Sequence, residues 1–343
     1  YTGQQIRHYR SAMEITGGKK LGPSSLSDTM YKTVYKTFQA LADYNVKFSK
    51  NDLSVLVGYT WEDESQRTVG GSRLNFPSDE VPYLNAGGAD GQTNSGGGYD
   101  WAIMSVFGRL TYNYDQRYLF ETTMRYDGSS RFAPETRWGN FWSLGASWRV
   151  DRESFMASTS DWLSALTLKM SYGAQGNDNL GTYYASKGLY SIVSNLGENA
   201  LVSDRMATPN LKWETNLNFN VGIDFSLFNN RFSGSFDFFT RRSKDLLYSR
   251  PIAPSLGYGS IDENVGALKN TGIEMVLNGT IINQNGWVWK LGMNLTHYKN
   301  KVTDLPLKDM PRSGVNKLQV GRSVYDFYMI EWAGVDPENG DPL

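Results

Sequence analysis

Large apolar residues recur at every second position over long stretches of this chain. Between residues 53 and 61 the alternate positions are Leu53, Val55, Val57, Tyr59 and Trp61. A period of two places successive side chains on opposite faces of an extended strand. Each such segment is therefore expected to form a strand with one apolar and one polar face, which suits a wall with lipid on one side and water on the other.

The same alternation occurs in about ten segments, which predicts an all-β, antiparallel fold. The predicted strands are 35–48, 53–63, 103–114, 118–127, 140–150, 165–174, 213–227, 232–248, 271–282 and 287–300. Most of them run for about 10 to 15 residues, which is long enough to cross a bilayer at a tilt. Strands of soluble proteins average about 5 or 6 residues. The strand length therefore favours a transmembrane β-barrel.

The connections between the predicted strands alternate between short and long. Short polar turns are expected at 49–52, 115–117, 228–231 and 283–286, and a short helix is expected in the link 151–165. Longer loops, rich in Gly and polar groups, are expected at 64–102, 128–139, 175–212, 249–270 and 301–343. An outer-membrane barrel has short periplasmic turns and longer extracellular loops. The series fits that pattern, with the long loops outside the cell.

Aromatic side chains gather at both ends of the predicted strands, on the apolar parity. Toward the long loops they include Phe38, Tyr59, Trp61, Trp142 and Tyr172. Toward the short turns they include Phe48, Tyr114, Tyr118, Trp148 and Trp289. Two aromatic bands around an aliphatic middle are typical of a barrel that faces lipid. The alternative is the rim of a soluble β-sandwich core.

Composition excludes several classes of function. The chain has 343 residues, a formal net charge of −1, no Cys and two His, which are His8 and His297. A near-neutral charge provides no electrostatic reason for a nucleic-acid partner. Without Cys and with two distant His, we expect no thiolate metal site and no Cys/His nucleophile. The sequence also contains no phosphate-binding or dinucleotide motif, so we expect no enzyme activity, catalytic residue, metal or cofactor.

Charged side chains lie on the polar parity of the predicted strands, which faces the lumen in a barrel. The candidate lumen-facing residues are Arg109, Arg125, Asp127, Arg149, Lys169, Asp224, Asp237 and Arg241. Their mixed signs provide hydrogen-bonding capacity without a strong selective field, which suits a neutral polar solute or a zwitterionic peptide. Contact with an internal plug, instead of a ligand, is the alternative for each of them.

Three aromatic residues of the long segment 64–102 are candidate ligand contacts. Tyr83, Tyr99 and Trp101 are expected to be exposed in a Gly-rich loop, where their rings would stack on a ligand. Ordinary loop packing is the alternative for all three.

Sequence motifs follow one another in a fixed order through residues 103–343. They include Gly108–Tyr114, Arg125–Phe132, Arg137–Ser143, Asn210–Glu214, Phe228–Arg231, Asn270–Glu274 and Trp332–Pro337. In these motifs the chain resembles the SusC/RagA family of TonB-linked outer-membrane transporters of Bacteroidota. Residues 1–102 fit that family by their strand pattern, with weaker motif content.

The resemblance implies a larger barrel of about 22 strands. A plug fills such a barrel, and a SusD-like surface lipoprotein covers its external mouth as a lid. This chain is expected to form roughly half of the barrel, as an internal or C-terminal portion. The implied parts are a partial extracellular loop at 1–34, about ten transmembrane strands over 35–300 and a truncated extracellular loop at 301–343. The plug and the TonB box are expected to lie outside this sequence.

The expected function is TonB-dependent import of oligosaccharides or peptides across the outer membrane of a Gram-negative, Bacteroidota-like cell. The lipid bilayer, the lid and the TonB system are the expected partners. A barrel with a role in assembly, scaffolding or adhesion is one alternative, and a secreted β-rich hydrolase is another. The motifs are strand, turn and loop signatures, so they identify no ligand residue and do not distinguish a glycan from a peptide.

Overall fold

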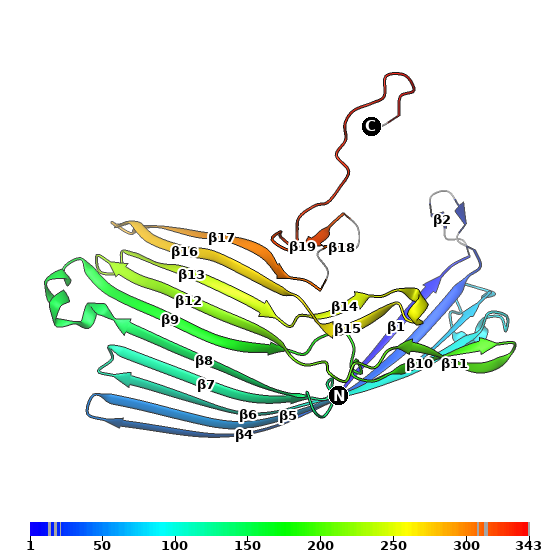
Figure 1. Ribbon diagram of the computed structural model, residues 1–343, viewed down its shortest axis with the longest axis horizontal. Helices are drawn as coiled ribbons and strands as arrows, with labels where there is room; N and C mark the ends of the chain where they lie inside the picture. The colour runs from blue at the N-terminus through cyan, green and yellow to red at the C-terminus, as the bar shows by residue number, and fades with distance from the viewer. Residues whose placement is uncertain (13–14, 17–18, 21, 307–308, 312–314, 342–343) are drawn as a thin grey trace. The chain divides into compact units, whose positions relative to one another are not determined.

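The computed structural model describes residues 1–12, 15–16, 19–20, 22–306, 309–311 and 315–341. Regular structure in these residues is almost entirely β (Figure 1). The helices among them are the short 3₁₀ helices η1 (Leu84–Ala86), η2 (Val150–Arg152), η3 (Ser154–Thr159) and η4 (Pro254–Leu256). None of the helices in the described residues is long and apolar enough to cross a membrane.

Eleven strands form the main sheet, and their order in the sheet follows their order in the chain. They are β1 (Thr2–Arg10), β4 (Ser25–Phe48), β5 (Asn51–Leu74), β6 (Thr93–Tyr114), β7 (Tyr118–Ser129), β8 (Trp138–Arg149), β9 (Leu163–Asn177), β12 (Glu214–Leu227), β13 (Phe232–Lys244), β16 (Ala267–Gln284) and β17 (Trp287–Asp304). All ten predicted strands are present, and the predicted antiparallel all-β class is confirmed.

Smaller two-stranded sheets lie in the connections between these strands. They are β2 (Ile15–Thr16) with β3 (Lys19–Lys20), β10 (Leu189–Asn195) with β11 (Glu198–Arg205), β14 (Leu247–Pro251) with β15 (Ser260–Asn264), and β18 (Asp309–Pro311) with β19 (Lys317–Gln319). The long loops are therefore partly built from hairpins of their own.

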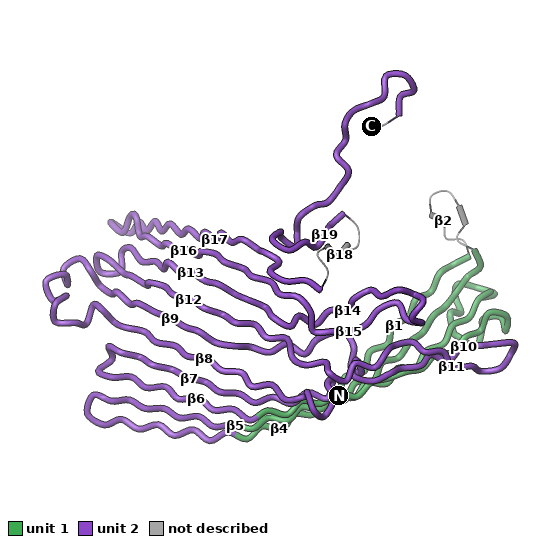
Figure 2. The backbone as a smooth tube through the Cα atoms, viewed as in Figure 1, with its two compact units in different colours: residues 1–40, 59–105 green, residues 41–58, 106–343 purple. Residues whose placement is uncertain are grey.

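Two compact units divide the chain (Figure 2). Unit 1 comprises residues 1–40 and 59–105, and unit 2 comprises residues 41–58 and 106–343. Unit 1 contains β1, β2, β3 and η1, together with residues 25–40 of β4, 59–74 of β5 and 93–105 of β6. Unit 2 contains the remaining parts of those strands and all later strands.

The secondary structure of residues 1–34, which lie in unit 1, differs from the one expected. The sequence pattern predicts a loop there, but the segment contains β1 and the beginning of β4. The two strands pair from Thr2 opposite Thr33 to Arg10 opposite Ser25. The alternation is not visible there because β1 carries polar residues on both parities. The position of 1–34 and of 301–343 outside the cell stays a prediction.

The expected loop 64–102 is also shorter than predicted. Strand β5 continues to Leu74 and β6 begins at Thr93, so residues 75–92 connect them. The apolar alternation ends at Trp61 because the same parity then carries charges. These charges pair across the strands, Lys36 with Asp63 at 3.2 Å and Arg67 with Asp100 at 3.0 Å.

The main sheet has an apolar face and a polar face in unit 2. The apolar face carries Met124, Leu144, Met170, Val221 and Phe238, which are between 36% and 59% exposed. In a soluble β-sandwich these side chains would be buried against a second sheet. Their exposure contradicts the sandwich alternative and agrees with a face that contacts lipid. The polar face carries Thr123, Ser143, Lys169, Asn220 and Asp237.

The link between β8 and β9 contains two 3₁₀ helices, η2 and η3, where a short helix was expected. Between them Glu153 accepts hydrogen bonds from Tyr118 Oη at 2.5 Å, Trp148 Nε1 at 3.0 Å and Arg117 Nη1 at 3.1 Å. The rings of Tyr118 and Trp148 stack with their centroids 6.5 Å apart. Glu153 therefore satisfies the polar atoms of two aromatic side chains whose rings lie on the apolar face.

Candidate functional site

Three of the predicted wall residues meet on the polar face. Lys169 Nζ lies 2.8 Å from Asp224 Oδ1 and 3.0 Å from Asp237 Oδ1. Gly222 of β12 pairs with Lys169 of β9 on one side and with Asp237 of β13 on the other. A Cβ atom on Gly222 would come within 2.1 Å of Asp237 Oδ1, so glycine lets this carboxylate lie against the backbone. The cluster places one cation between two anions.

Arg125 and Asp127 form a second pair, toward the end of β7 where the loop 130–137 begins. Arg125 Nε lies 2.6 Å from Asp127 Oδ1, and the guanidinium lies over the ring of Phe107 at 5.2 Å. The Asp127 residue is buried. The charge of Arg125 is therefore already compensated within the wall.

Arg149 lies at the opposite end of the sheet, where it pairs with Asp151 of η2 through two bonds of 2.9 and 2.8 Å. Asp151 Oδ1 also accepts a hydrogen bond from the backbone N–H of Leu166 at 3.0 Å. The Arg149 guanidinium, followed by the Leu166 N–H, holds the pKa of Asp151 below its ordinary value. The hydrogen bonds of Asp151 therefore join the ends of β8 and β9 to η2. Arg149 lies apart from the other candidate residues.

Arg109 and Arg241 stand apart as well. Both are exposed, and within the described residues neither forms an ion pair. The Arg241 guanidinium lies 5.2 Å from the centroid of the Phe239 ring. The eight predicted residues therefore form two compensated clusters, one structural pair and two separate cations.

The three aromatic candidates do not share one environment. Tyr83 precedes η1 in the connection 75–92, is 61% exposed, and has the Arg7 guanidinium 5.3 Å from its ring centroid. Tyr99 and Trp101 lie within β6, which corrects the loop predicted for them. The Tyr99 hydroxyl donates to Glu64 Oε1 at 2.7 Å. Tyr83 therefore remains an exposed ring, whereas Tyr99 and Trp101 are half-buried strand residues.

A small aromatic core joins loops 130–137 and 178–213 at the long-loop end of unit 2. The ring of Trp213 lies 5.5 Å from Phe132 and 5.3 Å from Phe141, and its Nε1 donates to the Arg137 carbonyl at 2.7 Å. All three rings are buried. Nearby, the fully buried Ser129 hydroxyl donates to Asp178 Oδ2 at 2.7 Å. The motifs that contain these residues do not reveal in sequence that they form one core, because alternation carries no information about contacts between loops.

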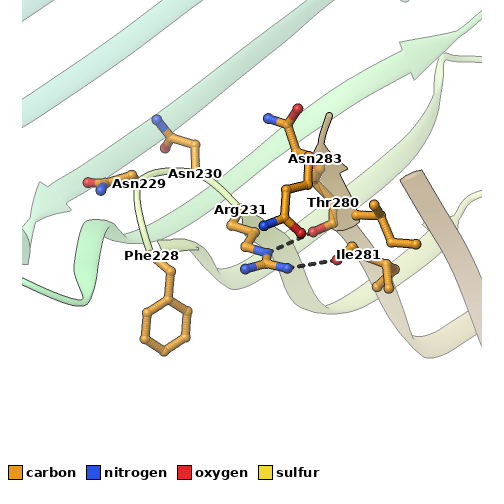
Figure 3. A pocket seen from close by; sticks show the side chains of 9 residues that line it. Phe228, Asn229, Asn230, Arg231, Thr280, Ile281 and Asn283 are labelled. Atoms are coloured by element: carbon orange, nitrogen blue, oxygen red, sulfur yellow. Dashed lines mark hydrogen bonds between the residues drawn. The ribbon is translucent and has the colours of Figure 1, made fainter. Parts of the chain in front are cut away.

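A polar cavity of about 540 Å³ lies at the short-turn end, between the turn 228–231 and the end of β16 (Figure 3). Arg231 points into it and donates to two successive backbone carbonyls, Thr280 at 2.9 Å and Ile281 at 2.7 Å. The register of β16 shifts at this point, between Thr280 and Ile282. A β-bulge leaves carbonyls outside the ladder, and Arg231 satisfies them. The Arg231 side chain in this cavity therefore stabilises the sheet.

Long antiparallel strands with an exposed apolar face and a charge-paired polar face define the wall of a transmembrane β-barrel. The sequence profile of the family described as "TonB dependent receptor-like, beta-barrel" matches residues 2–336, and the chain belongs to this family.

Comparisons with individual proteins agree. TonB-dependent receptor P3 of Formosa agariphila is 32% identical over 85% of this chain and 30% of its own length. TonB-dependent receptor SusC of Bacteroides thetaiotaomicron is 33% identical over 70% of this chain and 26% of its own length. A solved structure of the RagAB peptide transporter superposes with a TM-score of 0.88 and 28% identity, covering 99% of this chain and 38% of the matched one.

These similarities confirm the resemblance to SusC and RagA and place the chain in the barrel of an outer-membrane protein. The chain spans about a third or less of the curated relatives that it matches, with 30% and 26% of their lengths covered. The eleven strands of the main sheet agree with a portion of a larger barrel.

Proposed function

We propose that this chain forms about half of the wall of a TonB-dependent importer, with the polar face toward the lumen and the apolar face toward lipid. The observation that carries the proposal is the division of the same strands into two faces. Exposed Met124 and Met170 lie on one face, while the other holds Lys169 between two carboxylates. Apolar side chains exposed on a sheet are stable against lipid. Charged side chains are costly in hydrocarbon, and they lie on the other face of this sheet.

The external boundary of the bilayer is proposed to lie near Trp61. Phe38 and Tyr59 form an aromatic contact of 6.2 Å at this level, and the ion pair Lys36–Asp63 follows immediately. Residues 62–74 of β5 would then continue past this boundary for roughly 40 Å of strand length, at about 3.3 Å per residue. This extension, with the connection 75–92, provides a surface at which a SusD-like lipoprotein lid would dock.

The proposed cargo is an oligosaccharide or a peptide. The support is the similarity to a relative named SusC and to a solved structure of the RagAB peptide transporter. The compensated charges of Arg125 and Lys169 suit a neutral or zwitterionic solute. Energy would come from the TonB system through a segment outside this sequence.

The test is uptake of labelled oligosaccharides and peptides by cells that express the full-length protein, by a deletion strain and by a strain without TonB. We expect uptake of one cargo class in the first strain alone, and a surface lipoprotein that co-purifies in mild detergent. Equal uptake by all three strains, with the barrel still present in the first, would contradict import and favour a role in assembly or adhesion.

A more specific prediction concerns the lid. Replacement of residues 78–90 by a Gly-Ser linker of equal length should reduce recovery of the lipoprotein at least severalfold, because it removes Tyr83 and η1 but keeps β5 and β6. The heat-dependent gel shift of the folded barrel should not change. Undiminished recovery of the lipoprotein would contradict this docking surface. The single variant Tyr83→Ala tests the contribution of this ring alone.

A further inference from the structure

A cavity of about 310 Å³ lies on the polar face of unit 2. We call it the amide trough and define it by the carboxamides of Gln175, Asn218 and Asn220 and the hydroxyls of Thr123, Ser143 and Ser171. It lies across β7, β8, β9 and β12. Its volume is at the lower end of the range of about 300–1,000 Å³ for small-molecule sites.

A glycine keeps the trough open. Gly173 lies on β9, opposite Ser143 of β8 and Asn218 of β12. A Cβ atom at this position would lie 2.7 Å from the Trp142 carbonyl oxygen and 2.9 Å from Ser143 Cβ. Because both contacts are too close, only glycine fits between the neighbouring strands here. Because residue 173 has no side chain, the polar side chains of the trough surround an open space.

The carboxamides of the trough are only weakly engaged with the wall. Asn218 Nδ2 donates to Gln175 Oε1 at 3.3 Å, and Asn220 Nδ2 donates to Ser171 Oγ at 3.4 Å. Both distances exceed the usual range of about 2.7–3.2 Å. Each carboxamide provides two donors and an acceptor with two lone pairs, so most of its capacity is not used by these bonds.

Most charged side chains beside the trough already have ionic or hydrogen-bonding partners. Arg125, which also lines the cavity, is paired with Asp127 at 2.6 Å. Lys169, two residues before Ser171, is held by two carboxylates. Glu214 accepts from Asn216 Nδ2 at 3.2 Å and from the Leu247 N–H at 3.3 Å.

Arg241 is the exception at the edge of the trough. It lies opposite Asn218 in the register of β12 and β13, with its guanidinium over Phe239. It does not line the cavity.

Along the strands, the trough lies at the level of the aromatic band toward the long loops. On the opposite face of β8, β9 and β12, the ring of Tyr172 lies 5.4 Å from Trp142 and 6.4 Å from Phe219. If the proposed function holds, on which this inference rests, a cargo that enters the lumen passes the trough near the external membrane boundary.

We infer that the amide trough binds a neutral saccharide unit of the cargo. Carboxamides and hydroxyls exchange donors and acceptors with the vicinal hydroxyls of a sugar ring, and they need no counter-charge. A peptide terminus or charged side chain that leaves water requires an ionic partner. The trough provides none, because Arg125, the charged side chain in its lining, is already paired with Asp127.

The test uses the full-length receptor in detergent and calorimetric titration with neutral hexasaccharides, namely glucan, xylan, mannan and galactan fragments. Uncharged hexapeptides and a uronate-containing hexasaccharide form the comparison arms. The double variant Asn218→Ala/Asn220→Ala should raise the Kd of the bound neutral saccharide by roughly tenfold, as expected for two lost hydrogen bonds.

Two variants serve as controls. Asn278→Ala removes the same group from an exposed position of β16 outside the trough, and its Kd should stay within twofold of wild type. Arg241→Ala should likewise leave the affinity for the neutral saccharide unchanged. The melting temperature of the double variant should equal that of the wild type.

Several results would overturn the inference. They are an unchanged saccharide Kd in the double variant, loss of peptide binding instead of saccharide binding, dependence on Arg241 alone, a lowered melting temperature without loss of affinity, and a wild type that binds no saccharide of the panel. Failure of the proposed function is separate, since it would appear as absent TonB-dependent uptake in cells that express the wild type.

Discussion

The two ends of the sheet in unit 2 are stabilised in different ways. At the short-turn end, single side chains bond to neighbouring turns and backbone, as Glu153 and Arg231 do. At the long-loop end, segments far apart in sequence form a buried core around Trp213. Local hydrogen bonds suffice for tight turns, whereas long loops need tertiary packing to keep one conformation. The long-loop end is therefore a separate layer, whose stability should change independently of the membrane wall.

The largest expected effect comes from the aromatic core. Trp213→Ala should destabilise the loop layer by about 3–5 kcal/mol, because it removes a buried ring and its hydrogen bond to Arg137. Hydrogen exchange of residues 130–137 should accelerate, while exchange within β8 and β9 should not.

The control for this prediction is Trp138→Ala. Trp138 lies at the same end of the sheet but is 37% exposed and stacks on Tyr126 at 4.8 Å. Its loss should have a smaller effect on loop exchange. Equal acceleration in both variants would show that the buried core does not hold the loops.

A smaller effect is expected from the ion pair that joins β11 to β15. Arg205 Nη1 lies 2.6 Å from Asp262 Oδ2, and the Asp262 side chain is only 6% exposed. Arg205→Ala would leave a buried carboxylate without its partner and should destabilise the two hairpins by about 2 kcal/mol, after allowance for the partial exposure of Arg205.

The same hairpin provides a matched control for Arg205→Ala. Arg250 pairs with Glu263 at 2.9 Å, and both side chains are more exposed than Asp262. Arg250→Ala should therefore cost less than about 1 kcal/mol. Exchange rates of β10, β11, β14 and β15 provide the measurement, and an equal response to the two variants would contradict the role given to burial.

The smallest expected effect is at the short-turn end. Asp151→Asn keeps an acceptor for the Leu166 N–H but removes the charge that pairs with Arg149, so a loss of about 1 kcal/mol is expected at neutral pH. The pKa of Asp151 is lowered in the folded protein, so its stabilisation is lost as the pH falls below about 4.

Melting of wild type and Asp151→Asn at several pH values tests this prediction. The difference between them should shrink in acid, and a difference that grows would reverse the sign of the argument. Asp161→Asn, an exposed position in the same link, should melt like wild type throughout.

Sequence alternation predicted ten of the eleven strands of the main sheet, β7 to β9 among them, because lipid imposes a period of two on the outward residues. It failed for β1 and for the ends of β5 and β6, where ion pairs such as Arg67–Asp100 replace apolar residues. The polar wall was predicted as a set of residues, but not its pairing, because the register that brings Lys169 to Asp224 and Asp237 depends on strand pairing. The contact of Phe132 with Trp213 gave no sequence signal, since loop packing has no period.

The division of the sheet into a lipid face and a lumen face is tested most directly by single cysteines. The chain contains no native Cys, so each introduced thiol is unique within it. Bimane attached at Leu144→Cys and Ala146→Cys should be strongly quenched by brominated lipid, and bimane at Ser143→Cys and Ser147→Cys should not. Quenching of equal strength at all four positions, or stronger at 143 and 147, would contradict the account.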